Sequence, residues 1–326
     1  MSQRSSPRQN AGKTLRLMPC HAGGRSYYLD AASVRSVHRK EEWRLNWRSD
    51  SPLGWIRHGE SELPVLDLAR ALGVVHSQVA DNAFVVDTVE GPRAWGVGGV
   101  GRVISVAGDQ ILPVPEPCLE ANGGAPWLGL VTGQETEALC LAPQLLGAAE
   151  MNNAAVFPAF SSSSSAAAAP PSAGAKPTGR AILFSAYDGK GRLPEIRFCF
   201  GFGQIGEFIT APQVIPFPGG PAWLSGLLVW RERTVPIVNL ALASTGKPLP
   251  IDTEDFLVVR ATAGGIFAAV TVFGRPDTVE LPFQCEQAAS TESLAHPDWF
   301  QGIYRRKHQV ILLPDLSAIL AEPGSR

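Results

Sequence analysis

Short apolar runs separated by glycine, proline and polar turn residues follow one another along most of the chain. Runs in which apolar and polar positions alternate are typical of β-strands with one buried face. In the first half, the pattern predicts a short helix around 67–73 and strands at 14–18, 26–30, 33–38, 63–68, 83–88, 95–105 and 138–142. The second half repeats this order, with one additional Gly/Pro-containing stretch at 187–198 after its first strand. Because no long helices intervene, we expect an all-β protein built of small barrels, which remove exposed sheet edges by closing.

The two halves resemble each other in detail. The stretch GWIRHGESELPVLDLA at 54–69 has nearly the same layout as GLLVWRERTVPIVNLA at 226–241, with the glycine and the proline at the same interval. Trp127 and Trp299 are separated by the same offset as these two stretches, and each is followed by a glycine and then by an apolar run that ends in proline. Matching order and spacing of several landmarks predict a duplicated domain.

Between the halves the composition changes abruptly to serine, alanine and proline. A segment such as SSSSSAAAAPPS cannot bury enough apolar surface to offset the entropy that is lost on ordering. We therefore expect a disordered tail at 1–12, a first domain at 13–148, a disordered linker at 149–179 and a second domain at 180–322.

Composition argues against several classes of protein. Of 326 residues, 45% are hydrophobic and 18% are charged, which suits packed domains, and a net charge of -2 predicts no general attraction to nucleic acid or to an anionic membrane. The polar start is unlike a signal peptide, and no apolar run approaches the roughly 18 residues of a membrane-spanning helix. The five cysteines are scattered and never paired as C-x-x-C, which favours reduced thiols. We therefore expect a cytoplasmic protein that does not insert into a membrane.

The proline and the aspartate of the first repeated stretch are unusual residues for a strand. Proline has no N–H to donate, so we expect Pro64 at the first residue of its strand. Asp67 is placed to cap the segment that follows it, and Asn239 could do the same in the second half without charge. The residues between glycine and proline are then predicted to form an exposed loop, where polar side chains usually contact partners.

The layout of a glycine, nine further residues and Pro-Val-hydrophobic-Asp-Leu resembles the central signature of the CheW family, the adaptors of bacterial chemosensory arrays. The segments YYLDAASVRSVHR (27–39), AWGVGGVGRVISV (94–106), WLGLV (127–131) and WFQGIY (299–304) also resemble elements of that family. The resemblance implies two CheW-like domains, each a pair of small five-stranded SH3-like barrels around a shared apolar core. It implies a non-enzymatic scaffold that couples the cytoplasmic tips of chemoreceptors to the regulatory domain of a CheA-type histidine kinase, recruited to receptor arrays at the inner membrane.

The resemblance also identifies the two loops as partner-binding sites, although they depart from the family's pattern. Arg231 falls on the family's loop arginine, but Glu232 replaces the glycine that follows it. In the first loop Gly59 occupies the arginine position, so either an insertion places His58 and Gly59 in the Arg-Gly positions or Arg57 reaches the same place. The candidate partner-binding residues are Arg57, His58, Arg231 and Arg233. Nearby apolar grooves could be lined by Val34, Val37, Ile205 and Phe208, for which core packing is the alternative.

Other patterns give no support for catalytic residues, a cofactor or a metal site. GVGGVG at 96–101 fits a dinucleotide-binding pattern, but a strand-like segment follows where that motif needs a helix, which favours a glycine-rich bend. The six histidines are not spaced as metal ligands, and no hydrolase motif is present. RRKH at 305–308 is better interpreted as a solvated turn than as a phosphate site.

The sequence leaves alternatives open for the roles of the tryptophans and for the function of the chain. We expect Trp127 and Trp299 to pack in the core rather than anchor a partner, whereas Trp55 and Trp230 fit either role. The same fold could serve a pilus or gliding-motility sensory system instead of chemotaxis. The chain could also be an unrelated ligand-binding or enzymatic β-barrel protein, which a preformed apolar pocket with converging titratable groups would indicate.

Overall fold

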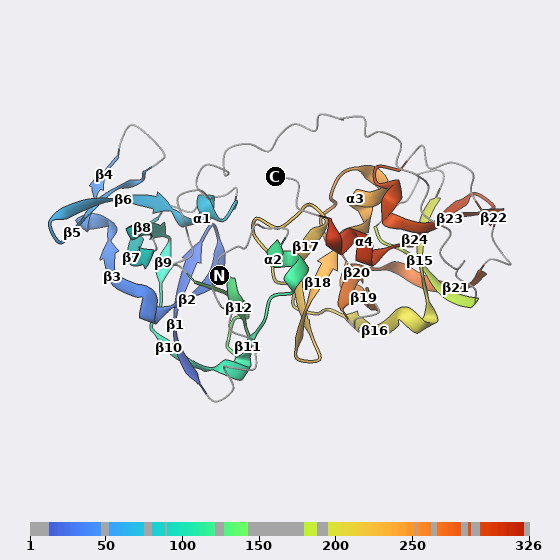
Figure 1. Ribbon diagram of the computed structural model, residues 1–326, viewed down its shortest axis with the longest axis horizontal. Helices are drawn as coiled ribbons and strands as arrows, with labels where there is room; N and C mark the ends of the chain where they lie inside the picture. The colour runs from blue at the N-terminus through green and yellow to red at the C-terminus, as the bar shows by residue number, and fades with distance from the viewer. Residues whose placement is uncertain are drawn as a thin grey trace. The chain divides into compact units, whose positions relative to one another are not determined.

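The computed structural model describes residues 13–46, 52–74, 80–88, 90–120, 127–142, 179–187, 195–251, 253–261, 266–281, 286–287 and 294–322. The chain divides into two compact units, Met1–Ser161 (unit 1) and Ser162–Arg326 (unit 2), coloured blue to green and yellow-green to red in Figure 1. The predicted tail and, apart from Gly179, the predicted linker lie outside the described residues.

Unit 1 contains two antiparallel-rich sheets among its described residues. The first has the order β10-β1-β2-β13-β12-β11, with β9 also pairing with β1. Its strands are β1 (Thr14–Ala22), β2 (Arg25–Asp30), β9 (Gly99–Val100), β10 (Ile104–Ala107), β11 (Ile111–Leu112), β12 (Trp127–Val131) and β13 (Ala138–Leu141). The second has the order β3-β7-β8-β6-β5-β4. Its strands are β3 (Val34–Arg39), β4 (Arg44–Leu45), β5 (Gly54–His58), β6 (Ser61–Asp67), β7 (Asn82–Thr88) and β8 (Gly91–Val97), and the short helices are α1 (Leu68–Ala71) and α2 (Glu116–Glu120).

Unit 2 has the same organisation. One sheet has the order β21-β14-β15-β24-β23-β22 and the other β16-β19-β20-β18-β17. The strands of the first sheet are β14 (Gly179–Ser185), β15 (Glu195–Gly201), β21 (Phe273–Leu281), β22 (Glu286–Gln287), β23 (Phe300–Arg306) and β24 (Gln309–Pro314). Those of the second are β16 (Ile205–Thr210), β17 (Leu224–Trp230), β18 (Arg233–Val238), β19 (Asp255–Arg260) and β20 (Phe267–Thr271), and the helices are α3 (Leu240–Thr245) and α4 (Leu316–Ala321).

The two units share one strand order, although β4 and β9 of unit 1 have no counterpart strand among the described residues of unit 2. Each strand of unit 2 takes the place in its sheet of a strand of unit 1, and the parallel pairs β2–β13 and β6–β8 recur as β15–β24 and β18–β20. The register also shifts at equivalent points, between Trp127 and Gly129 in β12 and between Phe300 and Gly302 in β23. The counterpart of Trp127 is therefore Phe300, and the matching offset of Trp127 and Trp299 does not reflect structural equivalence.

Buried apolar side chains form a cluster in each sheet, and in β7 and β19 four consecutive residues are buried, so both faces of these strands are covered. In unit 1 one cluster includes Leu17 and Cys140, and in unit 2 one includes Ile237 and Phe256. The all-β prediction is confirmed, whereas the barrels are not: only the β16–β20 sheet has five strands among the described residues, and no ladder there joins the two ends of a sheet. Closure of the barrels stays a prediction.

Two local predictions about the first repeated stretch have different outcomes. Pro64 is not the first residue of its strand: it lies inside β6, and Pro236 lies inside β18. Each proline stands one residue before the parallel ladder begins, at Val65 and Ile237, where the strand has one partner rather than two. A missing N–H is tolerated there for the same reason that proline is tolerated on edge strands.

The capping prediction is confirmed for one residue and wrong for the other. Asp67 Oδ1 accepts hydrogen bonds from the backbone N–H groups of Ala69 (2.9 Å) and Arg70 (3.3 Å), so it caps α1. Asn239 makes no side-chain cap, because its Nδ2 donates to Ser225 Oγ (2.9 Å) and to the Leu249 carbonyl (2.8 Å). The amide thus ties the start of α3 to two neighbouring segments instead.

The described cysteines, Cys20, Cys118, Cys140 and Cys199, are all buried. Burial raises the pKa of Cys118 and of Cys140 to about 12. Thiols that resist ionisation in this way are unreactive, which agrees with the expectation of reduced cysteines. Cys285 lies outside the described residues.

Candidate partner-binding site

The two predicted contact loops are tight hairpins rather than loops. β5 and β6 pair as far as His58 and Ser61, which leaves Gly59–Glu60 as the turn. β17 and β18 pair as far as Trp230 and Arg233, which leaves Arg231–Glu232. Most of the stretch between each glycine and proline is therefore strand, contrary to the prediction.

The hairpins settle the alignment of the candidate residues. Trp55 faces Pro64 in unit 1 and Leu227 faces Pro236 in unit 2, so the two hairpins have the same length and no insertion exists. The counterpart of Arg231 is Gly59. Arg57 lies two residues earlier on β5 and is exposed, with Nε donating to the Gly59 carbonyl at 3.3 Å. His58, the counterpart of Trp230, is half-buried.

The turn of unit 2 has a backbone that normally favours glycine. The φ angles of Arg231 and Glu232 are 48° and 59°, both in the left-handed region. Two successive residues with positive φ define the type I′ turn, whose twist matches that of the flanking strands. In the left-handed region a non-glycine residue costs roughly 1–2 kcal/mol. In unit 1 the first turn residue is Gly59, with φ 61°, which avoids that cost.

Trp230 connects the two end strands of its sheet. It is the last residue of β17, and its Nε1 donates to Glu207 Oε2 on β16 at 2.7 Å. A Cβ placed on Gly206 would lie 3.5 Å from the indole, so the ring packs directly against this part of β16. The Phe267 ring lies 4.8 Å from the indole, centroid to centroid. Because Trp230 is buried in this cluster, it is a core residue and not an exposed anchor.

Arg231 lies on top of this junction. Its guanidinium stacks over the Trp230 ring at 4.7 Å, and its Nη2 is 3.0 Å from Glu207 Oε2. The Trp230 hydrogen bond, followed by the charge of Arg231, lowers the pKa of Glu207. Since both partners are largely exposed, the ion pair adds little stability, but it holds the guanidinium in one place. Arg233, the first residue of β18, is exposed.

Unit 1 also has an arginine, tryptophan and glutamate group, but on the opposite face of its hairpin, because Trp55 corresponds to Leu227 and not to Trp230. Arg44 of β4 stacks over Trp55 at 5.0 Å, and its Nη2 is 2.9 Å from Glu62 Oε2. Trp55 is half-buried under this arginine. The cation thus comes from a neighbouring strand, whereas in unit 2 it comes from the turn itself.

Two of the four predicted groove residues are exposed. Val37 on β3 and Phe208 on β16 are each 44% exposed and occupy equivalent positions. Val34 and Ile205, also equivalent, are half-buried. Core packing therefore does not account for Val37 and Phe208, which present apolar surface on an end strand of each unit.

Sequence reasoning missed one hydrogen-bonded chain on β3. Ser36 Oγ lies 2.9 Å from His38 Nε2, and His38 Nδ1 lies 2.9 Å from Glu42 Oε2. The order serine, histidine, acid is that of a hydrolase triad. However, Glu42 is 54% exposed, and an end strand offers no enclosed site that would exclude water from a reaction. We regard the chain as a surface network.

Two other predictions, on the core tryptophans and on GVGGVG, agree with the structure. Trp127 and Trp299 are 7% and 2% exposed, as expected for core residues. GVGGVG spans the end of β8 and β9 with no helix after it, as a glycine-rich bend requires. Within the described residues, no group of metal-ligating side chains gathers, and none of their helices is long and apolar enough to cross a membrane.

Part of the chain is similar to a known family and to a solved structure. Residues 191–324 match the family model described as CheW-like domain. No curated protein matches the chain. Among solved structures, a similar one is the crystal structure of scaffolding protein TtCheW from Thermoanaerobacter tengcongensis. It is 13% identical, the match covers 42% of this chain and 88% of that chain, and the TM-score is 0.33.

Proposed function

We propose that the chain is a non-enzymatic adaptor that couples chemoreceptors to a CheA-type histidine kinase, on the premise that residues 191–324 match the CheW-like domain family model. The observation that carries the proposal is the family match at 191–324 together with the strand-for-strand repeat of its topology in unit 1. Two units of one fold give one chain two comparable binding faces, which is what a bridging adaptor needs.

The proposed binding faces include the β5–β6 and β17–β18 hairpin tips. In unit 2, Arg231 and Arg233 contact the partner. Arg231 is held against Trp230 and Glu207. The remaining N–H groups on its outer face are available to donate hydrogen bonds to a carboxylate or carbonyl oxygen of the partner. In unit 1, Arg57 and His58 take this role from one strand of the hairpin. Because Gly59 replaces the turn arginine, we expect the first tip to contribute less.

The proposed organisation places a tether between the domains, which we assign to 13–148 and 180–322. From its Ser/Ala/Pro composition, the segment 149–179 is expected to behave as a flexible chain, which at about 30 residues has a root-mean-square reach of roughly 30 Å. That reach lets both domains engage neighbouring partners in an array and gain avidity. The proposed location is the cytoplasm, at receptor arrays of the inner membrane.

The test is binding of the purified full chain to two probes, a receptor cytoplasmic-tip fragment and a kinase regulatory domain from the same cell. We expect both to bind. Arg231→Ala should weaken binding at least tenfold, and Arg57→Ala should weaken it less. Arg275→Ala, an exposed arginine on β21, is the matched control and should change nothing.

The outcomes separate the alternatives. If a folded chain binds neither probe, the coupling role is refuted, and components of a pilus or gliding sensory system become the next probes. If both probes bind but Arg231→Ala and Arg57→Ala lose equal affinity, or Arg231→Ala loses none, the coupling role stands and the assignment of the tips is wrong.

A further inference from the structure

A second pair of equivalent hairpins differs sharply in charge between the units. β12 and β13 pair as far as Val131 and Ala138, and β23 and β24 carry the equivalent pair Tyr304 and Ile311. Each pair encloses six residues, TGQETE at 132–137 and RRKHQV at 305–310. We call these the acidic tip and the basic tip. The two tips thus occupy equivalent places in their units and have the same length, but they carry opposite charges.

The charges of the acidic tip face solvent. Glu135 is exposed and Glu137 is half-buried. The backbone N–H of Thr132 donates to the Gln110 carbonyl at 2.8 Å, which brings the exposed Asp109 close to the same tip. Tyr28 Oη donates to the Thr136 carbonyl at 3.1 Å and fixes the far side of the tip to β2. The negative charges are therefore presented from a tethered backbone.

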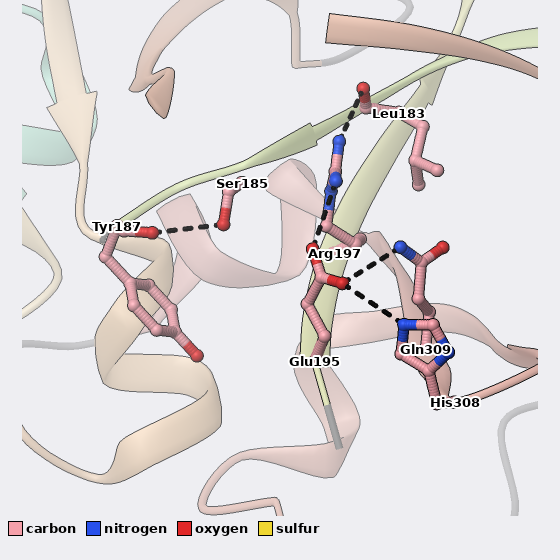
Figure 2. A network of polar contacts seen from close by, with 7 residues as sticks. All are labelled: Leu183, Ser185, Tyr187, Glu195, Arg197, His308 and Gln309. Atoms are coloured by element: carbon pink, nitrogen blue, oxygen red, sulfur yellow. Dashed lines mark hydrogen bonds and ion pairs between the residues drawn. The ribbon is translucent and has the colours of Figure 1, made fainter. Parts of the chain in front are cut away.

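The basic tip is equally well anchored, as Figure 2 shows. Glu195 at the start of β15 accepts a hydrogen bond from Gln309 Nε2 at 3.0 Å and pairs with Arg197 Nη1 at 3.1 Å. The hydrogen bond from Gln309, followed by Arg197, lowers the pKa of Glu195. Since Arg197 also pairs with this carboxylate, Glu195 compensates the charge of the tip only in part.

The cations of the basic tip project beyond this anchor. Arg305 and Lys307 are exposed and Arg306 is half-buried. Lys307 begins the two-residue turn with φ 56°, and His308 at the turn is 65% exposed and lies 3.7 Å from Glu195 Oε2. The tip thus presents a compact set of positive charges on a short hairpin.

From this complementarity we propose that the acidic tip of one copy of the chain binds the basic tip of a second copy. The contact joins two different surfaces, so a pair of copies keeps one free acidic tip and one free basic tip, and assembly continues into a ring or an open chain. Exposed ion pairs are individually weak and are screened over about 8 Å at physiological ionic strength. The association is therefore concentration-dependent and is lost in high salt.

The experiment measures the mass of the full chain by sedimentation velocity over a wide concentration range, in low salt and in high salt. We expect the average mass to rise with concentration in low salt and to return to that of the monomer in high salt. Glu135→Lys/Glu137→Lys makes both tips basic, and Arg306→Glu/Lys307→Glu makes both acidic. For each variant alone, the dissociation constant of self-association should be at least tenfold higher than that of the natural chain.

Mixing supplies the decisive arm. The two charge-reversed variants, each monomeric alone, should associate when mixed, and a chain that carries all four changes should associate like the natural chain. Arg180→Glu/Arg275→Glu, which reverses two exposed arginines on β14 and β21, is the matched control and should leave association intact. A monomeric natural chain at every concentration in low salt would overturn the proposal. A mixture that stays monomeric would also overturn it. So would variants whose mass stays that of the monomer while their frictional ratio rises, because this would show that the tips pair within one chain. Because no receptor or kinase is present, the result does not depend on the proposed function.

Discussion

Truncating Trp299 tests whether the two tryptophans that precede the last apolar run of each half are core residues or partner anchors. Trp299 is 2% exposed, and its ring stacks on His296 with centroids 4.3 Å apart. A buried aromatic side chain covers 150–250 Å², which at roughly 25 cal/mol per Å² corresponds to about 4–6 kcal/mol of transfer free energy. Measured losses for such truncations are about 3–5 kcal/mol. At about 2–4 °C per kcal/mol for a unit of this size, Trp299→Ala should lower the melting temperature of unit 2 by roughly 10 °C.

The assay is differential scanning calorimetry of the full chain, with partner binding measured on the same samples below the transition. Trp127→Ala, at 7% exposed and stacked on Tyr27, should give a comparable loss confined to unit 1. Trp55→Ala is the matched control, because that half-buried ring should cost much less. If Trp299→Ala leaves the melting curve unchanged but abolishes partner binding, the ring is an anchor and the reasoning from burial is refuted.

Three further changes probe local features. Asp67→Ala should destabilise unit 1 by about 1 kcal/mol through loss of the α1 cap, measured by urea unfolding, whereas Asp67→Asn should lose less; equal effects would contradict the capping role. Because the folded pKa of Glu195 is lowered, its contribution is present above the unfolded pKa of about 4.3 and is lost as the pH falls through the folded pKa. Glu195→Gln should therefore flatten the acid limb of the stability profile, and an unchanged limb would count against the network. Glu232→Gly should stabilise unit 2 by up to about 1 kcal/mol by relieving a left-handed residue, and a loss of stability would show that the turn is not strained.

The duplicated order of strands could be predicted because apolar periodicity and turn residues are local properties of the chain. The hairpin around Gly59 could not be predicted. The residues at the end of β5 and at the start of β6 are polar, and such a run looks like a loop until the strand pairing is known. The prolines were misplaced for a related reason. Whether a strand has one partner or two at Pro64 depends on where β8 joins, which is set by residues about thirty positions later. Asp67 and Asn239 look equivalent in sequence, and only the neighbours of Asn239 divert its amide from the helix.

The candidate site shows the same limit more sharply. Arg231 could be found by its position between a glycine and a proline, but its contact with Glu207 could not, because that residue belongs to the opposite end strand of the sheet. The exposure of Val37 and Phe208 could not be predicted from the apolar pattern either, since an apolar residue on a strand is usually expected in the core. What a residue touches across a sheet is a property of the folded unit and not of the segment that carries it.

The turn of unit 2 gives the physical argument that the two partner-binding tips are under different constraints. Unit 1 places glycine at the first turn position, where positive φ costs nothing. Unit 2 places arginine and glutamate at two such positions and accepts a penalty that a glycine would remove. The ion pair of Arg231 with Glu207 is largely exposed and too weak to offset that penalty. Backbone strain of this kind persists where the surrounding structure imposes it or where function requires the side chain. The hairpin of unit 1 has the same length but a different turn, in which Gly59 alone has a positive φ, so a hairpin of this length can also close with one left-handed residue fewer. This strain is the physical reason for our proposal that the Arg231 guanidinium contacts a partner and that unit 2 makes the stronger contact.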